Sequence, residues 1–283
     1  PRTPTDPYMS EPESIAKADS PLDLSLSSEE LEARREHITD FIADQLDAGG
    51  VDRAVLGLSG GVDSSLVAHL AVEAIGAENL HGLVMPSTVN DEATMSDAER
   101  IAMDLGIEYD VIEINPIVDT FLDAYPEAEG EKMAVGNVRV RARAVLNYLV
   151  ANTEGGLVLG TGNRTESLTG YFTKYGDGAV DCHPIANLYK QQVRQLARHV
   201  GVPAEIAERT PTAGMWVDQT DEAELGVEYD TLDSILALAI EGEVETSATA
   251  RIVGVDEELV ERVGALYEQS GHKRSVPPAP ETL

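Results

Sequence analysis

The stretch AVLGLSGGVDSS, residues 54–65, decides the fold of this chain. Residues 54–58 form a run of apolar or small side chains without polar alternation, which is typical of a strand buried on both faces. Ser59, Gly60 and Gly61 then make a turn, and a helix-forming pattern follows directly. Glycines let the backbone approach an anion, and a helix start presents free N–H groups. We therefore predict a strand, a tight turn and a helix whose junction binds a phosphate.

Short apolar runs alternate with amphipathic stretches on both sides of this loop. A first helix is expected to begin after Ser27, because Glu30 lies at capping-box spacing, and to end at Gly49-Gly50. Further strands are expected over 80–85, 109–114 and 157–159, and helices over 65–75, 91–105, 135–150, 189–200, 229–240 and 256–270. This order predicts a doubly wound α/β fold, in which helices cover both faces of a parallel sheet. The binding site should lie beyond the carboxyl ends of the strands.

The chain divides into three segments. Residues 1–23 mix Pro, Ser, Thr and acids without periodicity, so we expect a flexible N-terminal extension. Residues 24–275 are expected to form a single domain, since 283 residues are marginal for two. Residues 276–283 are expected to be a Pro-rich tail. Within the domain, the Gly-, Thr-, Asn- and Asp-rich stretch 160–184 is long for a passive connection and predicts a functional loop.

Acidic side chains dominate the composition. The chain has 51 Asp and Glu against 20 Lys and Arg, a net charge of −31, which repels nucleic acids and anionic membranes as partners. The acids are spread along the chain, which favours the solvated surface of a halophilic protein over that of an ordinary acidic protein. Cys182 is the single cysteine, and there is no apolar run of membrane-spanning length, so we expect a cytoplasmic protein.

The phosphate loop fits neither of two common types. It lacks the Gly-Lys-Ser/Thr of a Walker A sequence and the G-x-G-x-x-G spacing of a dinucleotide fold. It resembles instead the pyrophosphate loop of the N-type ATP pyrophosphatases, which include NAD synthetase, GMP synthetase, asparagine synthetase and tRNA-thiolating enzymes. The resemblance implies an adenine nucleotide alpha hydrolase-like fold and cleavage of ATP between its α and β phosphates. The ATP contacts that it implies in this loop are Gly57, Leu58, Ser59, Gly60, Gly61, Val62, Asp63 and Ser64.

Two further strings narrow the resemblance. GTGNRTE at 160–166 and GYFTKYGDG at 170–178 resemble the signature of NAD synthetase, and the similarity extends to His272-Lys273. It implies amidation of deamido-NAD by ammonia and ATP through an adenylated nicotinate carboxylate, with AMP and pyrophosphate as products. Free ammonia is the implied nitrogen source, because this resemblance fills most of the chain. The alternatives are another pyrophosphate-loop adenylating ligase or a non-catalytic nucleotide-binding regulator.

The resemblance assigns roles to individual residues. Asp63 and Glu166 match ligands of Mg²⁺, a hard cation that prefers carboxylate oxygen; the alternative for Glu166 is an exposed residue at a helix start. Thr161, Lys190 and Thr212 match further ATP contacts. The positions that match deamido-NAD contacts are Arg141, Lys174, Asp181, His272 and Lys273. Asp177 is our candidate acceptor for the proton that ammonium must lose.

Some neighbouring residues have other interpretations. Arg139 and Arg143 lie about 200° around a helix from Arg141, so we interpret both as surface or ion-pair residues. Trp216 suits either stacking on a ring of the substrate or a buried anchor. His183, beside a proline, is interpreted as structural. The family resemblance also implies a homodimer with the substrate pockets near the subunit interface.

Overall fold

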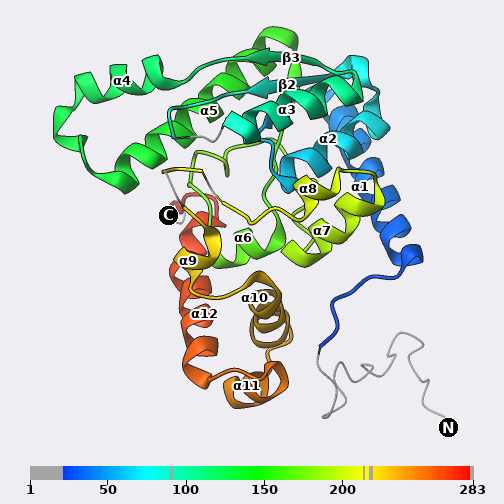
Figure 1. Cartoon of the computed structure of the whole chain (residues 1–283), viewed down its shortest axis with the longest axis vertical. Helices are drawn as coiled ribbons and strands as arrows, with labels where there is room; N and C mark the ends of the chain where they lie inside the picture. Colours follow the sequence, from blue (N-terminus) through cyan, green and yellow to red (C-terminus); the bar gives the residue numbers. More distant parts are fainter. Residues whose placement is uncertain (1–21, 90–91, 213, 217–218, 281–283) are drawn as a thin grey trace.

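The computed structural model describes residues 22–89, 92–212, 214–216 and 219–280. Our expectations for residues 1–21 and 281–283 lie outside these ranges. The centre of the described fold is a sheet of four strands in the order β3-β2-β1-β4, and each neighbouring pair is parallel (Figure 1). The strands are β1 (Arg53–Leu58), β2 (Leu80–Val84), β3 (Glu108–Val111) and β4 (Gly156–Leu159).

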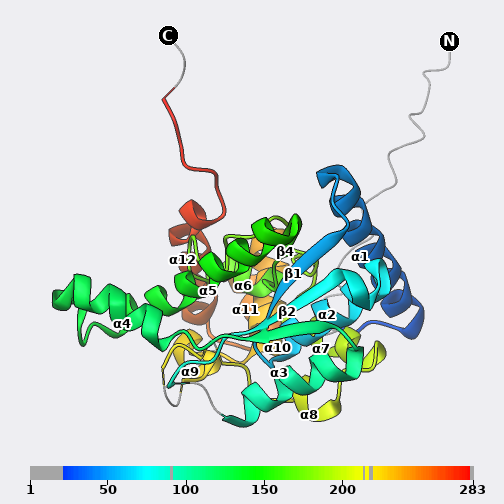
Figure 2. The same ribbon diagram turned by 90° about the horizontal axis from the view of Figure 1, so that it is seen from above.

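Helices cover both faces of the sheet (Figure 2). One layer consists of α1 (Ser28–Gly49), α2 (Val62–Ile75), α3 (Glu92–Leu105) and α7 (Lys190–His199). The other contains α4 (Asn115–Ala124) and α5 (Lys132–Glu154). Successive strand residues point to opposite layers: Leu56 joins the core beneath α2, whereas Val55 joins the core beneath α5. The predicted doubly wound α/β fold is confirmed.

A third hydrophobic core lies in the C-terminal helices. These are α10 (Tyr229–Ile235), its π-helical continuation η3 (Leu236–Glu241), α11 (Thr246–Val253) and α12 (Glu257–Gln269). They pack on α6 (Arg164–Thr169) and α7, below the sheet in Figure 1. The shorter elements are α8 (Ala204–Ala207), α9 (Asp221–Leu225), η1 (Ala77–Asn79), η2 (Pro126–Ala128) and η4 (Gly271–Lys273).

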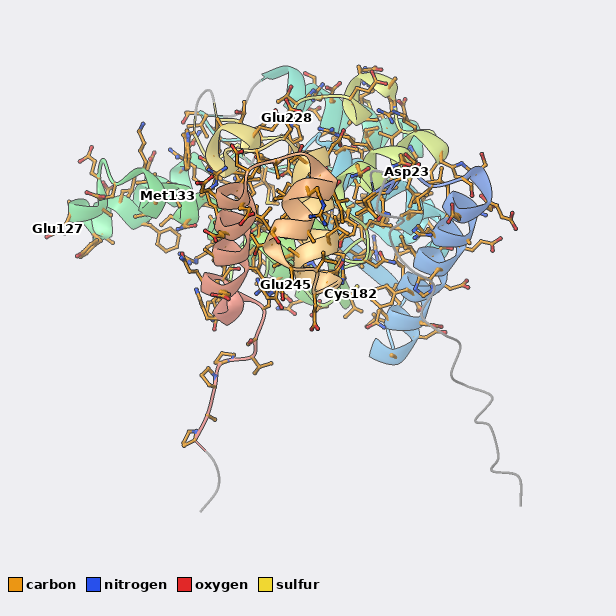
Figure 3. All side chains as sticks on the ribbon, turned by 90° about the horizontal axis from the view of Figure 1, so that it is seen from below. Asp23, Glu127, Met133, Cys182, Glu228 and Glu245 are labelled. Atoms are coloured by element: carbon orange, nitrogen blue, oxygen red, sulfur yellow. The ribbon has the colours of Figure 1, made fainter. Side chains whose placement is uncertain are left out.

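An arm formed by α4 and η2 protrudes from the body (Figures 1 and 3). Glu127 marks its outer part in Figure 3. Phe121 and Tyr125 on this arm are exposed, as are Val145 and Leu149 on α5. The described surface therefore carries large apolar side chains on the α4–α5 side of the sheet.

The observed boundaries differ from the predicted ones in a few places. Helix α2 begins at Val62 rather than at residue 65, because Gly61 already serves as its N-cap. Strand β3 ends at Val111, three residues before the predicted end of its strand, and is paired only with β2 among the described strands. The capping box of Ser27 and Glu30 is present as predicted. Residues 276–280 are exposed and have no helix or strand.

Candidate active site

The phosphate loop connects β1 to α2 and curls around the Ser64 hydroxyl. The Ser64 Oγ accepts a bond from the Ser59 N–H at 3.2 Å, donates to the Gly61 carbonyl at 3.2 Å and lies 3.0 Å from Ser59 Oγ. Gly60 has φ +76°, a left-handed conformation that favours glycine. Helix α2 has no side-chain cap among the described residues, so the N–H groups of its first turn are available to an anion.

A cavity of about 870 Å³ opens in front of this loop, at the carboxyl ends of β1, β2 and β4. This is the switch point of the sheet, because β2 and β4 lie on opposite sides of β1. Nearly all the predicted site residues line the cavity: Gly57, Leu58, Ser59, Gly61, Val62, Asp63, Ser64, Arg141, Thr161, Glu166, Lys174, Asp177, Lys190, Thr212, His272 and Lys273. Gly60 and Asp181 are not among the lining residues.

Asp181 lies at the edge of the sheet. Its Oδ2 accepts a bond from the Val158 N–H at 2.7 Å, and its Oδ1 accepts one from the Tyr148 hydroxyl at 3.2 Å. These bonds fasten the segment after the functional loop to β4. Asp181 therefore has a structural task in this conformation, and its predicted contact with a substrate stays a prediction.

Three charged side chains meet at one end of the cavity. The Lys190 ammonium lies 2.5 Å from Asp63 Oδ2 and 3.3 Å from Glu166 Oε1. Asp63 is in the first turn of α2, Glu166 is near the start of α6, and Lys190 begins α7. The side chain of Glu166 is only 19% exposed, so it is not the exposed helix-start residue of the alternative interpretation.

Asn163, which the sequence did not single out, links two of these groups. Its Nδ2 donates to Asp63 Oδ1 at 2.9 Å, and its Oδ1 accepts a bond from the Glu166 N–H at 3.0 Å. Glu166 Oε2 accepts the return bond from the Asn163 N–H at 3.2 Å, which completes a capping box at the start of α6. Asn163 is fully buried, so it holds both carboxylates in fixed positions.

The electrostatics of this group follow from its burial. Burial and the nearby Asp63 carboxylate raise the pKa of Glu166, while the Lys190 ammonium acts in the opposite direction. For Lys190, burial alone would lower the pKa, but the carboxylates of Asp63 and Glu166 outweigh it and raise the pKa above its ordinary value. The lysine is thus held as a cation between two acids.

These residues fit the binding of Mg²⁺. Asp63 and Glu166 supply oxygen ligands that face one common cation in this structure, the Lys190 ammonium. No cluster of three or more His, Cys, Asp or Glu suited to a metal occurs in the part of the chain that the structure describes. The remaining ligands would therefore come from phosphate oxygens and water, as is usual for Mg²⁺.

The candidate substrate residues Arg141, Lys174, His272 and Lys273 line the same cavity and form a second group. Arg141 Nη2 donates to the Lys174 carbonyl at 3.1 Å, and the Lys174 ammonium donates to the His272 carbonyl at 2.5 Å. Lys273 donates to the carbonyls of Gly170 and Phe172 at 2.6 and 2.8 Å. The C-terminal segment is therefore bound to the loop that follows α6. In this conformation both lysines bind backbone oxygens.

Asp177 lies in the same loop and faces the cavity. Its Oδ1 accepts a bond from the Thr173 N–H at 2.6 Å. The residue is exposed to the open cavity, but the surrounding protein partly desolvates its carboxyl, and this desolvation raises the pKa to about 6 despite the opposing N–H bonds and the charge of Lys273. A carboxyl with this pKa can exchange a proton near neutrality.

Arg143 corrects our interpretation of it as a surface or ion-pair residue, whereas Arg139 is half-exposed and does not line the cavity. Arg143 lines the cavity and donates from Nε to the Met85 carbonyl at 3.0 Å, and burial lowers its pKa to about 10. Arg139 donates to the Met215 carbonyl at 3.1 Å. Helix α5 runs along the cavity, so a wide arc of its circumference faces inward. The angle between the two residues around the helix therefore did not predict that Arg143 faces the cavity as Arg141 does.

Three other residues lie at or near the cavity. Trp216 lines the cavity, which is compatible with both of its interpretations. Arg209, missed in the sequence, also lines it; the guanidinium donates to the Gly60 carbonyl at 3.3 Å and pairs with Asp97. His183 is not among the lining residues, and burial lowers its pKa, which agrees with a structural role.

The fold and the cavity together indicate a broad class of proteins, the ATP pyrophosphatases. A glycine–serine loop at the switch point of a parallel sheet, facing two carboxylates and a buried lysine, is the arrangement implied by resemblance to the ATP pyrophosphatases. The sequence model of the NAD synthase family matches residues 34–277. This chain belongs to the NAD synthase family.

Several known proteins resemble the chain over most of its length. The NH(3)-dependent NAD(+) synthetase of Halobacterium salinarum strain R1 is 57% identical over 272 residues, covering 96% of this chain and 100% of the relative. The enzyme of the same description from Archaeoglobus fulgidus is 48% identical over 244 residues, covering 86% and 94%.

Solved structures agree with this membership. The NMN synthetase of Francisella tularensis superposes with a TM-score of 0.79 at 32% identity, covering 91% of this chain and 100% of that one. The NH3-dependent NAD synthetase of Campylobacter jejuni, in complex with nitrate, gives a TM-score of 0.76 at 28% identity with the same coverage. A glutamine-dependent NAD+ synthetase from Acinetobacter baumannii is covered over only 48% of its length.

Proposed function

We propose that this chain is a C–N bond-forming ligase that amidates deamido-NAD to NAD with ammonia and ATP. The observation that carries the proposal is the meeting of Asp63, Glu166 and Lys190 beside the phosphate loop. Membership of the NAD synthase family and relatives described as NH(3)-dependent NAD(+) synthetases support it.

The first chemical step makes the nicotinate carboxylate reactive. One of its oxygens bonds to the α-phosphorus of ATP while the bond from that phosphorus to the β-phosphate oxygen breaks. The products are a mixed anhydride with AMP and free pyrophosphate. The loop at residues 59–65 binds the leaving pyrophosphate through its N–H groups and hydroxyls, and the Lys190 ammonium stabilises the charge that develops on it.

Mg²⁺ is proposed at Asp63 and Glu166, where it would neutralise phosphate charge and orient the triphosphate. The protein's own contribution is alignment, because carboxylate and α-phosphorus must approach each other against like charge. Arg141, Lys174, His272 and Lys273, which line the cavity, are proposed to hold deamido-NAD, and Asp181 is proposed as a further contact. Thr161 and Thr212 are proposed as further ATP contacts.

In the second step ammonia attacks the carbonyl carbon of the mixed anhydride, the nitrogen releases a proton to solvent, and AMP leaves as the bond from that carbon to the phosphate oxygen breaks. The nitrogen arrives as ammonium and must lose a proton before it can attack. Asp177 is proposed as the acceptor, because its carboxylate faces the cavity and its pKa is raised to about 6. The reaction needs no covalent bond to the enzyme.

The experiment is a product assay with purified protein, ATP and MgCl₂. Deamido-NAD is combined with ammonium in one arm and with glutamine in another; NAD, AMP and pyrophosphate should form in equal amounts with ammonium. A third arm offers nicotinate mononucleotide, because the Francisella tularensis relative is described as an NMN synthetase. Preferential amidation of the mononucleotide would overturn the proposed substrate. Equal NAD formation from glutamine alone would overturn the nitrogen source.

Two alternatives have their own outcomes in this assay. Pyrophosphate release with a different carboxylate only would indicate another adenylating ligase. ATP binding without pyrophosphate release for any acceptor would indicate a nucleotide-binding regulator.

The described residues include no helix of sufficient length and apolar character to span a membrane. We propose a cytoplasmic location, for which the single cysteine and the use of ATP are the support.

A homodimer through α5 is also proposed. Val145 and Leu149 are 65% and 59% exposed and lie four residues apart, as do Val145 and Arg141, so all three share one side of the helix. Pairing through this side would place the predicted substrate residue Arg141 near the interface. The double variant Val145→Glu with Leu149→Glu should be monomeric by light scattering, whereas Val276→Glu, at a position 87% exposed in the tail, should not change the mass.

The chain is proposed to be halophilic, on the basis of its net charge of −31 and its relative in Halobacterium salinarum. Salt screens repulsion between surface acids. Thermal unfolding in increasing KCl should show rising stability well beyond physiological salt. Maximal stability in dilute buffer would contradict this proposal.

Residues 24–275 are proposed to form one domain, which should unfold in one transition in the same experiment.

A further inference from the structure

One carboxylate outside the cavity wall binds the starts of two site helices. Asp233, on α10, is fully buried. Its Oδ1 accepts a bond from the Thr165 hydroxyl at 2.5 Å, and its Oδ2 accepts one from the Gln191 N–H at 2.9 Å. The Thr165 Oγ1 in turn accepts a bond from the Lys190 N–H at 2.9 Å. Asp233 is therefore connected to α6 and α7 at the same time.

The bonded positions lie directly beside the charged groups of the site. Thr165 precedes Glu166 in the first turn of α6, and Gln191 follows Lys190 at the start of α7. N–H groups in the first turn of a helix have no acceptor within the helix, and a negative charge there is favourable. Asp233 satisfies the Gln191 N–H directly and the Lys190 N–H through Thr165.

A second residue on the same side of α10, Tyr229, contacts the Lys190 side chain. The ring centre of Tyr229, four residues before Asp233, lies 5.4 Å from the Lys190 ammonium. The Tyr229 hydroxyl donates to Asp221 Oδ2 at 2.8 Å. One side of α10 therefore reaches Lys190 in two ways: Tyr229 contacts its ammonium group, and Asp233 is linked to its backbone N–H through Thr165.

A carboxylate at this depth requires an explanation. Burying a charge is costly unless it is bonded, and apolar residues would fill the same volume more cheaply. The bonds that the structure shows for Asp233 lead only to the starts of α6 and α7. Its charge thus fixes the relative position of two helices that come from a different part of the fold.

We propose that Asp233 is a positioning residue, which holds Glu166 and Lys190 in register for the triphosphate through Thr165 and Gln191. The inference rests on the proposed function and adds to it a residue that does not touch the substrates. A shift of either helix start would move the Glu166 carboxylate and the Lys190 ammonium relative to Asp63. Small misplacements of this kind reduce rates strongly.

The test compares Asp233→Asn with Asp230→Asn, an exposed position on the same helix. An asparagine places an NH₂ group where one of the two carboxylate oxygens accepts a bond, so one of the two donors loses its acceptor. We expect kcat/KM for ATP to fall about 10- to 100-fold and the Mg²⁺ concentration for half-maximal activity to rise. The KM for deamido-NAD should stay close to the wild-type value, and Asp230→Asn should match the wild type in every constant.

A second pair of variants keeps the test decisive if Asp233→Asn does not fold. Thr165→Val removes the hydroxyl at nearly constant volume, whereas Thr165→Ser retains it. We expect Thr165→Val to show the same loss for ATP and Mg²⁺, and Thr165→Ser to restore both constants.

Three results would overturn the inference. In the first, Asp233→Asn and Thr165→Val leave the ATP and Mg²⁺ constants unchanged. In the second, Thr165→Ser loses as much activity as Thr165→Val. In the third, the KM values for ATP and deamido-NAD rise together, which would indicate general loosening. Wild-type protein that forms no NAD would instead contradict the proposed function, so the two failures are distinguishable.

Discussion

The Lys190 ammonium lies 2.5 Å from Asp63 Oδ2, although the two residues are 127 positions apart in the chain. The side chain of Lys190 is only 3% exposed. The contact joins the start of α7 to the start of α2, where the phosphate loop runs into that helix. Folding of the C-terminal half therefore completes the electrostatics of a loop formed by the N-terminal half.

Lys190→Met should abolish turnover and weaken the fold. It leaves the Asp63 and Glu166 carboxylates facing each other without their cation, and breaking a buried ion pair costs about 3–5 kcal/mol. Urea unfolding measures the stability and the NAD assay the activity. Lys132→Met, at an exposed position at the start of α5, is the matched control and should behave like the wild type.

Two substitutions of Asn163 should separate its two tasks. Asn163→Asp keeps an oxygen that can cap α6 but loses the N–H donor to Asp63, and it adds a further carboxylate. Asn163→Ala loses both, including a cap worth about 1 kcal/mol. We expect both variants to lose activity, and only Asn163→Ala to lose helix capping. Retained activity in Asn163→Asp would show that its amide donor is dispensable.

The reaction should slow as the pH falls through about 6, because Asp177 can accept a proton only as a carboxylate and its pKa is raised to about 6 by desolvation. The pH profile of kcat/KM for ammonium, corrected for the fraction of free ammonia, checks this limb. Asp177→Asn should remove it together with most of the activity. A limb that persists in this variant would assign the titration to another group.

The raised pKa of Asp177 affects stability in the opposite direction to activity: the free energy of unfolding should fall as the pH rises. The folded state raises the pKa of Asp177 above its ordinary value of 3.8, so this contribution is present below that pH and is lost as the pH rises through about 6. The amplitude should be small, since the side chain remains in contact with water in the cavity. Relative to Asp177→Asn, the wild type should therefore lose a little stability over this range in urea unfolding.

Gly170→Ala should displace the C-terminal segment from the substrate loop. Gly170 has φ +68°, and an added Cβ would lie 2.1 Å from the Ser270 Cβ. Gly155→Ala is a matched control, because its φ is +71° and nothing lies within 4 Å of the added Cβ. Both variants carry the backbone strain of about 1 kcal/mol, so the difference in unfolding free energy isolates the clash. Only Gly170→Ala should also raise the KM for deamido-NAD.

The sheet and its order of elements could be predicted because each buried strand is a short apolar run followed by a helical period. Helix α4 was missed, since it begins with Asn115-Pro116 directly after a stretch that we expected to be strand. Proline is tolerated in the first turn of a helix, so it marked a start rather than a break. Strand β3 is shorter than expected because it lies at an edge, where half-exposed residues weaken the pattern.

The site residues that could be predicted lie in contiguous strings with a family resemblance. Asn163 lies inside one of these strings, but nothing in the string indicated its contact with Asp63, and Asp233 lies outside them. Asn163 contacts Asp63 across 100 positions, and Asp233 contacts Thr165 across 68, so their importance depends on how distant segments pack. The inward position of Arg143 likewise depends on where α5 crosses the cavity.

The capping box at α6 has a consequence for ion selectivity. One oxygen of Glu166 accepts the Asn163 N–H, so a cation at the proposed site would compete with this capping bond at that oxygen and not at the other. A small ion that binds one oxygen of each carboxylate would leave the capping bond intact. A larger ion that binds both oxygens of a carboxylate, as Ca²⁺ often does, would compete with the cap and weaken it. Discrimination between the two would then come from the hydrogen bonds of the backbone rather than from the width of the cavity.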